Sequence, residues 1–245
     1  MKIDWNINED DIRKIADFVN QQSGEYIANR IARNINYQGL LINRDTILYS
    51  LLHSLLLSSL KSDNYLHIDS ITTSARYNFQ YLTIKDIQDI KSYASETLKN
   101  HGLALDLKKM PEYFAYNFDL LESTNWELVD RLIRKLCIKE SKKAEREIAD
   151  YIDTMFKGFG ACEARVFLQT LGLTKFEIPI DSMVSDWLND FGFPVKLSPF
   201  ALQDRNFYHF VSDGVQLLCK RADVYPCVLE AAIHASNLSK QFEIM

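Results

Sequence analysis

The sequence predicts an all-α protein, and three observations support this. Residues that break helices are scarce, with 8 glycines and 5 prolines among 245 residues. Leu, Ile, Lys, Glu and Ser, which helices tolerate well, are frequent. Apolar residues recur at spacings of three and four along most of the chain. At this length the chain can bury a substantial core, as one large domain or as two smaller lobes.

The predicted helices follow one another from the N-terminus. Asn8 and Asp11 are expected to cap the first helix, which buries Ile12 and Ile15. Further helical patterns cover about 24–35, 45–58, 84–99, 127–136, 141–156, 161–172 and 182–191. Thr124 and Glu127 have the spacing of a capping box, and Gly192 is expected to end the helix over 182–191.

Two segments depart from this simple pattern. The helix that begins at Asp45 is apolar over most of its circumference and is therefore expected to be central. Residues 61–82 are rich in Thr, Tyr and Ile, so a short hairpin or an irregular loop is predicted there.

Charge and cysteine content exclude several classes of protein. The net charge of −5 argues against a general polyanion binder, although it allows a local basic face. The four cysteines lack metal-ligand spacing, so we expect reduced thiols and no metal site built from side chains. The sequence has no Gly-rich Walker or dinucleotide fingerprint, so no organic cofactor is expected. The longest apolar run, 47–60, is too short and too rich in serine to span a bilayer, and the acidic N-terminus is unlike a signal peptide. A cytoplasmic protein without membrane contact is expected.

Residues 157–187 carry the strongest functional signal. Gly158 and Gly160 flank Phe159 in a turn between two amphipathic stretches, and both glycines are expected to permit positive φ and close approach of another backbone. The N–H groups of such a turn and of the following helix can bind a phosphate, with Lys157 beside it. A basic run that includes Lys142 and Lys143 lies upstream and is interrupted by glutamates, so it is either a DNA-facing surface or a solvated helix face.

Asp181 follows the apolar segment 176–180 and precedes the helix at 182–191. Aspartate is a preferred N-cap, and capping alone could explain it. The functional alternative is compatible with capping. Helix N–H groups would hold the carboxylate ionised, and it could then stabilise positive charge on a deoxyribose ring as a base departs.

The segment resembles the helix-hairpin-helix (HhH-GPD) DNA glycosylase superfamily, most closely its 8-oxoguanine DNA glycosylase branch. Gly158 and Gly160 match the hairpin glycines of that family, and 179–181 match its Pro-hydrophobic-Asp segment. The resemblance implies a two-lobed helical protein with a DNA cleft, in which Asp181 is catalytic. One lobe would be a helical barrel over 39–181, and the other would combine 1–38 with 182–245.

Weaker similarities to the family lie outside this segment. The helix end at 55–59 is similar to the one that supplies the wedging residues, which implies Ser59 and Leu60 here. Phe207 and Phe210 lie where relatives build part of the base pocket, although core packing explains them as well. The resemblance also implies a monovalent cation at the hairpin carbonyls.

The chain departs from the family at two positions. Cys162 occupies the position of the lysine that attacks C1′ in the strand-cleaving members, so lyase activity is expected to be absent. Met183 stands where relatives place a phosphate-contacting histidine. Three explanations of Cys162 are open: a monofunctional glycosylase in which Asp181 activates water, a non-cleaving DNA-binding descendant, or an introduced substitution of a native lysine.

The leading hypothesis is a nucleoid-associated DNA N-glycosylase that excises a modified purine, expected to be oxidised, from double-stranded DNA in base excision repair or antiphage defence. The alternatives are a non-catalytic glycosylase-like DNA-binding accessory of a larger complex, and a helical interaction protein without DNA contact. The five histidines are scattered, and each is interpreted as structural or exposed.

Overall fold

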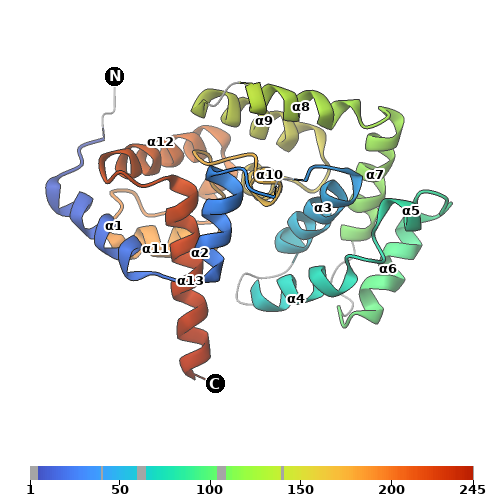
Figure 1. The fold of residues 1–245 in the computed structure, drawn as a ribbon, viewed down its shortest axis with the longest axis horizontal. Coiled ribbons are helices and arrows are strands. Elements are labelled where there is room, and N and C mark those ends of the chain that lie inside the picture. The colour runs from blue at the N-terminus through green and yellow to red at the C-terminus, as the bar shows by residue number, and fades with distance from the viewer. Residues whose placement is uncertain (1–4, 40, 60–64, 104–108, 139–140, 245) are drawn as a thin grey trace. The chain divides into compact units, whose positions relative to one another are not determined.

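The computed structural model describes residues 5–39, 41–59, 65–103, 109–138 and 141–244. Every regular element in these ranges is helical, which confirms the predicted all-α class (Figure 1). The first elements are α1 Glu9–Gln21, α2 Glu25–Arg30, the π-helix η1 Ile31–Ile35, α3 Arg44–Ser59, α4 Tyr65–Ala75, α5 Tyr81–Ile84 and α6 Ile90–Asn100. They are followed by α7 Met110–Ser123, α8 Glu127–Ile138, α9 Lys142–Met155, α10 Ala161–Thr170, α11 Ser182–Phe191, the 3-10 turn η3 Ala201–Gln203, α12 Arg205–Arg221 and α13 Pro226–Ile244.

The chain forms two compact units. The first contains residues 1–40 and 174–245, and the second contains residues 41–173. The sequence prediction grouped 174–181 with the central residues, whereas their contacts group them with the termini. Hydrogen bonds to residues near both ends of the chain hold this segment. Asn34 Nδ2 donates to the Thr174 carbonyl at 2.8 Å, Cys227 N donates to the Lys175 carbonyl at 3.2 Å, and the Tyr208 hydroxyl donates to the Ile178 carbonyl at 3.0 Å.

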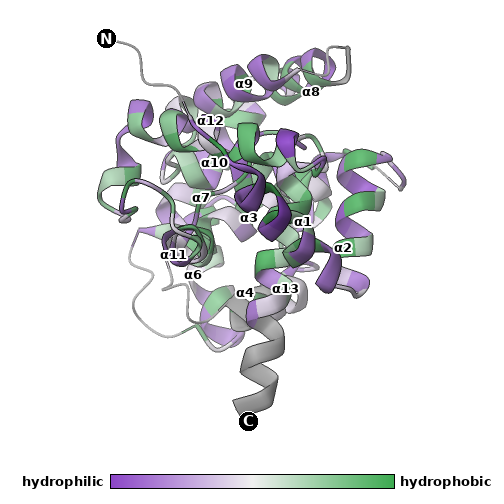
Figure 2. Cartoon of the chain, turned by 90° about the vertical axis from the view of Figure 1, so that its left-hand side faces the viewer, coloured by the Kyte–Doolittle hydropathy of each residue, from purple (hydrophilic) through white to green (hydrophobic). Residues whose placement is uncertain are grey.

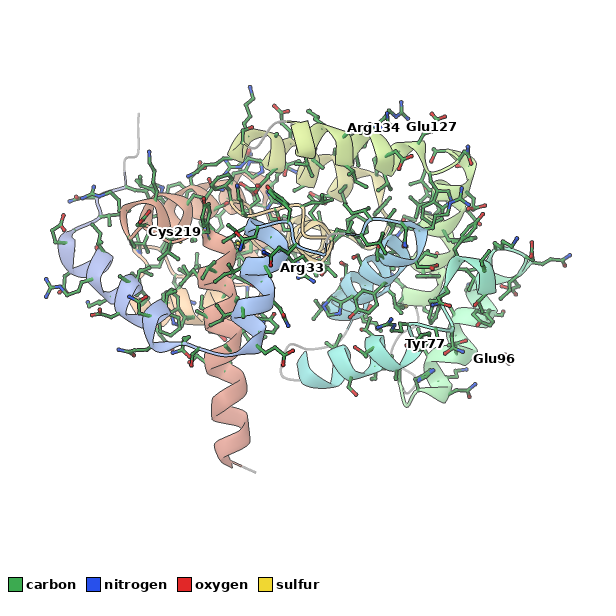
Figure 3. The ribbon with its side chains drawn as sticks, in the orientation of Figure 1. Arg33, Tyr77, Glu96, Glu127, Arg134 and Cys219 are labelled. Atoms are coloured by element: carbon green, nitrogen blue, oxygen red, sulfur yellow. The ribbon has the colours of Figure 1, made fainter. Side chains whose placement is uncertain are left out.

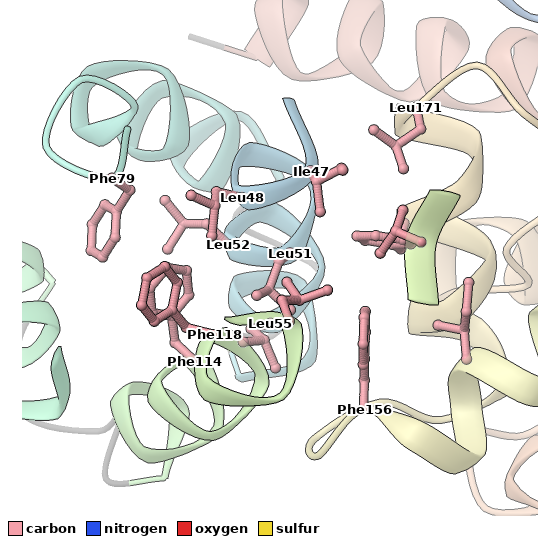
Figure 4. Close-up of a cluster of buried hydrophobic side chains, with 14 of the residues drawn as sticks. Ile47, Leu48, Leu51, Leu52, Leu55, Phe79, Phe114, Phe118, Phe156 and Leu171 are labelled. Atoms are coloured by element: carbon pink, nitrogen blue, oxygen red, sulfur yellow. The ribbon is translucent and has the colours of Figure 1, made fainter. Parts of the chain in front are cut away.

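Helix α3 is the core element of the second unit, and it packs against α4, α7 and α10. Its buried apolar side chains are Ile47, Leu48, Leu51, Leu52, Leu55 and Leu56. Figure 4 shows aromatic rings of Phe79, Phe114, Phe118 and Phe156 among the side chains of this cluster. Each buried leucine or isoleucine contributes roughly 1.5–3 kcal/mol relative to exposure. Ser50 and Ser54 of α3 are buried as well, and the Ser54 hydroxyl is satisfied inside the helix because it donates to the Ser50 carbonyl at 2.8 Å.

The prediction of a hairpin or irregular loop over 61–82 was wrong for residues 65–75, whereas residues 76–80 form an irregular turn. Residues 65–75 form α4, in which Ile68, Ile71, Thr72 and Ala75 are buried at helical spacing. This burial pattern outweighs the preference of Thr, Tyr and Ile for strands, because strand propensity is weak and depends on context.

Two helix boundaries also differ from the prediction. The helix expected over 84–99 begins at Ile90, where Asp89 accepts the Ser92 N–H at 2.9 Å and acts as the cap. The predicted capping box at Thr124 is absent. The Thr124 hydroxyl donates to the carbonyls of Leu120 and Leu121 and so closes the preceding helix α7.

Helices α8 and α9, which precede the turn at 156–160, are amphipathic. Hydrophobic and hydrophilic residues alternate along α8 and α9, as expected for helices with one buried face (Figure 2). Arg165, which is fully buried, joins α10 to α9, since its guanidinium donates to the Ala161 carbonyl at 2.9 Å and lies 3.4 Å from Asp150 Oδ1. This contact fixes how the two helices enter and leave the turn.

Candidate active site

The turn at 156–160 owes its shape to residues of α7 and α3. The Asn117 side chain accepts the Lys157 N–H at 2.8 Å and donates to the Lys157 carbonyl at 2.9 Å. Because Asn117 is fully buried, this pair of bonds is shielded from water and anchors the turn firmly. The Lys157 ammonium lies 3.9 Å from the centroid of the Tyr116 ring, within the range of a cation–π contact.

The two glycines of the turn have different roles. Gly158 has φ of +82°, as predicted, and a Cβ placed there would lie 2.3 Å from Tyr113 Cδ2. Gly160 has φ of −129°, so the expectation of positive φ was wrong at this position. Its restriction is spatial and comes from a side chain, because an added Cβ would lie 3.0 Å from Glu163 Oε2.

Glu163 occupies the start of α10 and shapes the predicted phosphate site. Its Oε2 accepts the Gly160 N–H at 2.9 Å, so the carboxyl takes a donor that the prediction reserved for phosphate. Burial raises the pKa of Glu163 above its ordinary value, and Asp153 adds to this effect, while hydrogen bonds from Gly160 and Ser58 oppose it. Phosphate binding at this turn therefore requires either the remaining N–H groups or movement of Glu163.

Of the other predicted site residues in the second unit, some lie close to this turn along the chain and two lie at the far end of α9. Cys162 is the second residue of α10 and is half-buried. Ser59 ends α3, beside the Ser58 side chain that hydrogen-bonds Glu163, and Leu60 lies outside the described residues. Lys142 and Lys143 begin α9, whose fourteen residues separate them from the turn by roughly 20 Å.

The basic run is partly neutralised within its own unit. Lys135 Nζ lies 3.0 Å from Glu147 Oε2, and Lys143 Nζ lies 3.8 Å from Glu147 Oε1. On α8, the labelled Arg134 and Glu127 are both exposed, so cations and anions alternate on this surface (Figure 3). This arrangement matches the solvated-face alternative more closely than a concentrated cationic patch.

The hairpin carbonyls give little support to a bound cation. The Lys157 carbonyl already accepts from Asn117, and the Phe156 carbonyl accepts the Phe159 N–H at 3.4 Å. The fit to a monovalent ion is therefore poor. Across the described ranges, no group of three or more His, Cys, Asp or Glu side chains could hold a metal ion.

Asp181 belongs to the first unit and caps α11. Its Oδ1 accepts the Val184 N–H at 2.9 Å, and its side chain is 23% exposed. Ile180, which precedes it, donates its N–H to the Tyr208 hydroxyl at 2.8 Å inside the core. The aspartate is thus held on both sides by hydrogen-bonded backbone, as the capping interpretation predicted. The adjacent Ser182 hydroxyl is buried and finds no protein partner in the described part of the chain, which leaves a polar group that a water or a ligand could satisfy.

A buried array of charged groups lies behind Asp181, and the sequence analysis missed it. His234 Nε2 lies 3.1 Å from Asp181 Oδ2 and 3.4 Å from Glu230 Oε1. Glu230 in turn pairs with Arg30, which also approaches the Tyr26 hydroxyl at 3.3 Å. The side chains of His234, Glu230 and Arg30 are only 2%, 3% and 7% exposed. The available signal was the spacing of Glu230 and His234, four residues apart on one helix face.

The electrostatics of the array favour a charged pair. Burial by itself would raise the pKa of Asp181, but the His234 imidazole and the N–H groups of Val184 and Met183 outweigh it and lower that pKa below its ordinary value. Burial would lower the pKa of His234, and Arg30 acts in the same direction, but Asp181 and Glu230 outweigh both and raise it. Asp181 is therefore a carboxylate at neutral pH.

The candidate base-pocket residues pack against the N-terminal segment. The Phe210 ring stacks on Trp5 with centroids 4.5 Å apart, and Trp5 also contacts Phe193 at 5.0 Å. Phe207 lies 6.3 Å from Phe210, measured between ring centroids. These contacts account for Phe210 as a packing residue, in line with the core interpretation.

Comparisons with known proteins add no assignment: no protein-family model, curated protein or solved structure matches the chain significantly. Within the described ranges, each helix is too short or too polar to cross a lipid bilayer.

Proposed function

We propose that this protein is a monofunctional DNA N-glycosylase that releases a modified purine, in the first place 8-oxoguanine, from double-stranded DNA. The observation that carries the proposal is Asp181. This carboxylate is held ionised at the start of α11, is backed by a buried imidazole and retains 23% of its side-chain surface exposed. A charged group kept partly accessible against the cost of burial is typical of a site that acts on a ligand.

In the proposed reaction Asp181 stabilises the positive charge that grows on the sugar. The bond between C1′ and the ring nitrogen breaks, and its electron pair leaves with the base. A water oxygen then bonds to C1′, and the proton that water loses ends on the departed base. The products are a free base and an abasic sugar, and Asp181 is unchanged.

The enzyme is proposed to lack lyase activity because Cys162 replaces the amine of the strand-cleaving relatives. A thiol can attack carbon, but its adduct forms no iminium, so the electron sink that strand cleavage needs is missing. The extruded base would be selected by the low cost of unstacking a damaged pair. Base excision repair and antiphage defence are both consistent with this chemistry.

The test is base release from duplexes that carry 8-oxoguanine and other modified purines, followed by mass spectrometry of the free base. We expect a released base without strand cleavage from the chain as it stands. The variant Cys162→Lys is the positive control, because it should additionally form an adduct with DNA that borohydride traps. Absence of released base from every duplex, with both proteins, would remove the catalytic proposal.

A non-catalytic DNA-binding accessory is the second candidate. One observation favours it: Cys162 stands at the lysine position. The Glu163 carboxyl on the Gly160 N–H instead weighs toward a protein without DNA contact, because it takes a donor that a phosphate would use. The accessory alternative requires that DNA affinity be unchanged by Asp181→Asn and that no base be released. If charge reversal at Lys142 and Lys143 leaves retention of DNA unaltered, the helical interaction protein without DNA contact is favoured instead.

A further inference from the structure

The residues behind Asp181 form a chain of alternating charge. Along the array the order is Arg30 on α2, Glu230 and His234 on α13, and Asp181 at the start of α11. All four belong to the unit of residues 1–40 and 174–245. The ionisable side chains acting on the imidazole are Asp181, Glu230 and Arg30, and the Tyr26 ring stacks beside it with centroids 6.4 Å apart.

The geometry fixes which ring nitrogen carries a proton. Both carboxylates approach the same atom, His234 Nε2, at 3.1 and 3.4 Å. Ionised carboxylates only accept protons, so these two short distances are attractive only when Nε2 carries a proton.

The charge balance of the array decides whether the imidazole carries a second proton. Arg30 and Glu230 neutralise one another, which leaves the single negative charge of Asp181. With a neutral His234 the array would carry a net charge of about −1 next to side chains that are nearly inaccessible to water, and a buried unpaired charge is costly. An imidazolium makes the four groups neutral together. The array is therefore most stable with His234 charged.

The contacts also fix the orientation of the Asp181 carboxylate. Oδ1 is bound to the Val184 N–H at 2.9 Å, and Oδ2 lies 3.1 Å from His234. Anchors on two oxygens from two directions set the plane of the group. Each carboxylate oxygen still has a further lone pair, so the exposed part of the side chain can face a sugar ring or a water.

We infer that His234 is the positioning residue of this site: as an imidazolium between Asp181 and Glu230, it holds Asp181 as an oriented carboxylate and restricts it to stabilising charge on the sugar. The inference rests on the proposed function for its catalytic consequence. A carboxylate that is already paired with an imidazolium is a weak proton acceptor. Asp181 therefore stabilises the sugar cation, and the proton of the attacking water passes to the departing base.

The first experiment does not need activity. Nuclear magnetic resonance titration of the full chain, labelled at histidine, follows five imidazoles, and the signal lost in His234→Gln identifies His234. We expect the His234 imidazole to titrate above the ordinary value of about 6.5. In Asp181→Asn its titration should shift to lower pH, because the neighbouring charge is lost. A wild-type His234 that stays neutral through the range, or one that Asp181→Asn leaves unmoved, overturns the inference.

The second experiment separates positioning from simple structural support. In single-turnover base release, His234→Gln should slow the reaction roughly ten- to hundred-fold, the range expected for loss of one close interaction with a charged group. It should also move the acidic limb of the pH–rate profile to higher pH, because Asp181 loses the charge that keeps it ionised. His101→Gln, a histidine of the other unit, should change neither. An unmoved acidic limb in folded His234→Gln contradicts the inference.

The two failures remain distinguishable. If no base is released by the wild-type chain but His234 titrates as expected, the proposed function fails while the paired state of Asp181 stands. If base is released but His234 titrates as a neutral ring, the function stands and the positioning role fails. Should His234→Gln fail to fold, single substitutions of the other four histidines assign the remaining signal to His234, and its titration in the wild-type chain and in Asp181→Asn decides the inference.

Discussion

Substitution of Gly158 tests the geometry of the turn between α9 and α10. An alanine at φ of +82° adopts a conformation that costs L-residues about 1–2 kcal/mol. Its Cβ would also lie 2.3 Å from Tyr113 Cδ2, 2.9 Å from Tyr113 Cγ and 3.0 Å from Leu55 Cδ2. The Tyr113 contact is at the base of the ring, so the whole ring must move, and such overpacking costs roughly 1–3 kcal/mol more. Gly158→Ala should therefore lower the free energy of unfolding by about 2–5 kcal/mol.

Gly102→Ala is the matched control in the same unit. Gly102 has φ of +87°, but an added Cβ there meets nothing within 4 Å, so only the backbone cost of about 1–2 kcal/mol applies. Urea unfolding followed by circular dichroism measures both variants. The double variant Gly158→Ala with Tyr113→Ala should recover most of the steric part. If Gly158→Ala is no more destabilising than Gly102→Ala, the close contact between the turn and α7 is refuted.

Two further predictions concern the unit that holds Asp181. Tyr208→Phe leaves the buried Ile180 N–H and the Ile178 carbonyl without their hydrogen-bond partner, so it should lower the free energy of unfolding in urea by roughly 1–3 kcal/mol. Base release should also be slower if Asp181 moves. Unchanged stability would contradict the role given to Tyr208 in holding this segment. The raised pKa of His234 contributes stability that is fully present below about pH 6.5 and is lost as the pH rises through the pKa of His234 in the folded protein. The lowered pKa of Asp181 contributes stability that is present above about pH 4 and is lost as the pH falls through the pKa of Asp181 in the folded protein. Unfolding free energies measured across pH should therefore differ most between wild type and His234→Gln from about pH 4 to 6.5, and a difference that grows above that window would refute the pairing.

The sequence was sufficient for elements that periodicity and capping define. Helix α11 begins after Asp181 and ends at Gly192, whose φ of +96° suits only glycine well, and both boundaries were predicted. Helix α4 was missed because Thr and Ile favour strands by composition, while their burial at helical spacing depends on the neighbouring helices.

The candidate site was only partly accessible from sequence. Asp181 and Gly158 lie within one continuous motif, so local pattern was enough to select them. The array behind Asp181 joins residues 30, 181, 230 and 234, and no local pattern connects α2 with α13. Asn117, which anchors the turn from 40 residues away in the chain, was missed for the same reason.

The measurement that tests the central claim most directly is single-turnover release of 8-oxoguanine by wild type, Asp181→Asn and Asp204→Asn. Asp204 caps α12 as Asp181 caps α11, with its Oδ1 accepting the Phe207 N–H at 2.8 Å, and asparagine preserves an N-cap in both places. Base release that is lost in Asp181→Asn and retained in Asp204→Asn is the predicted result. Equal rates in all three proteins would show that the charge of Asp181 takes no part in the chemistry.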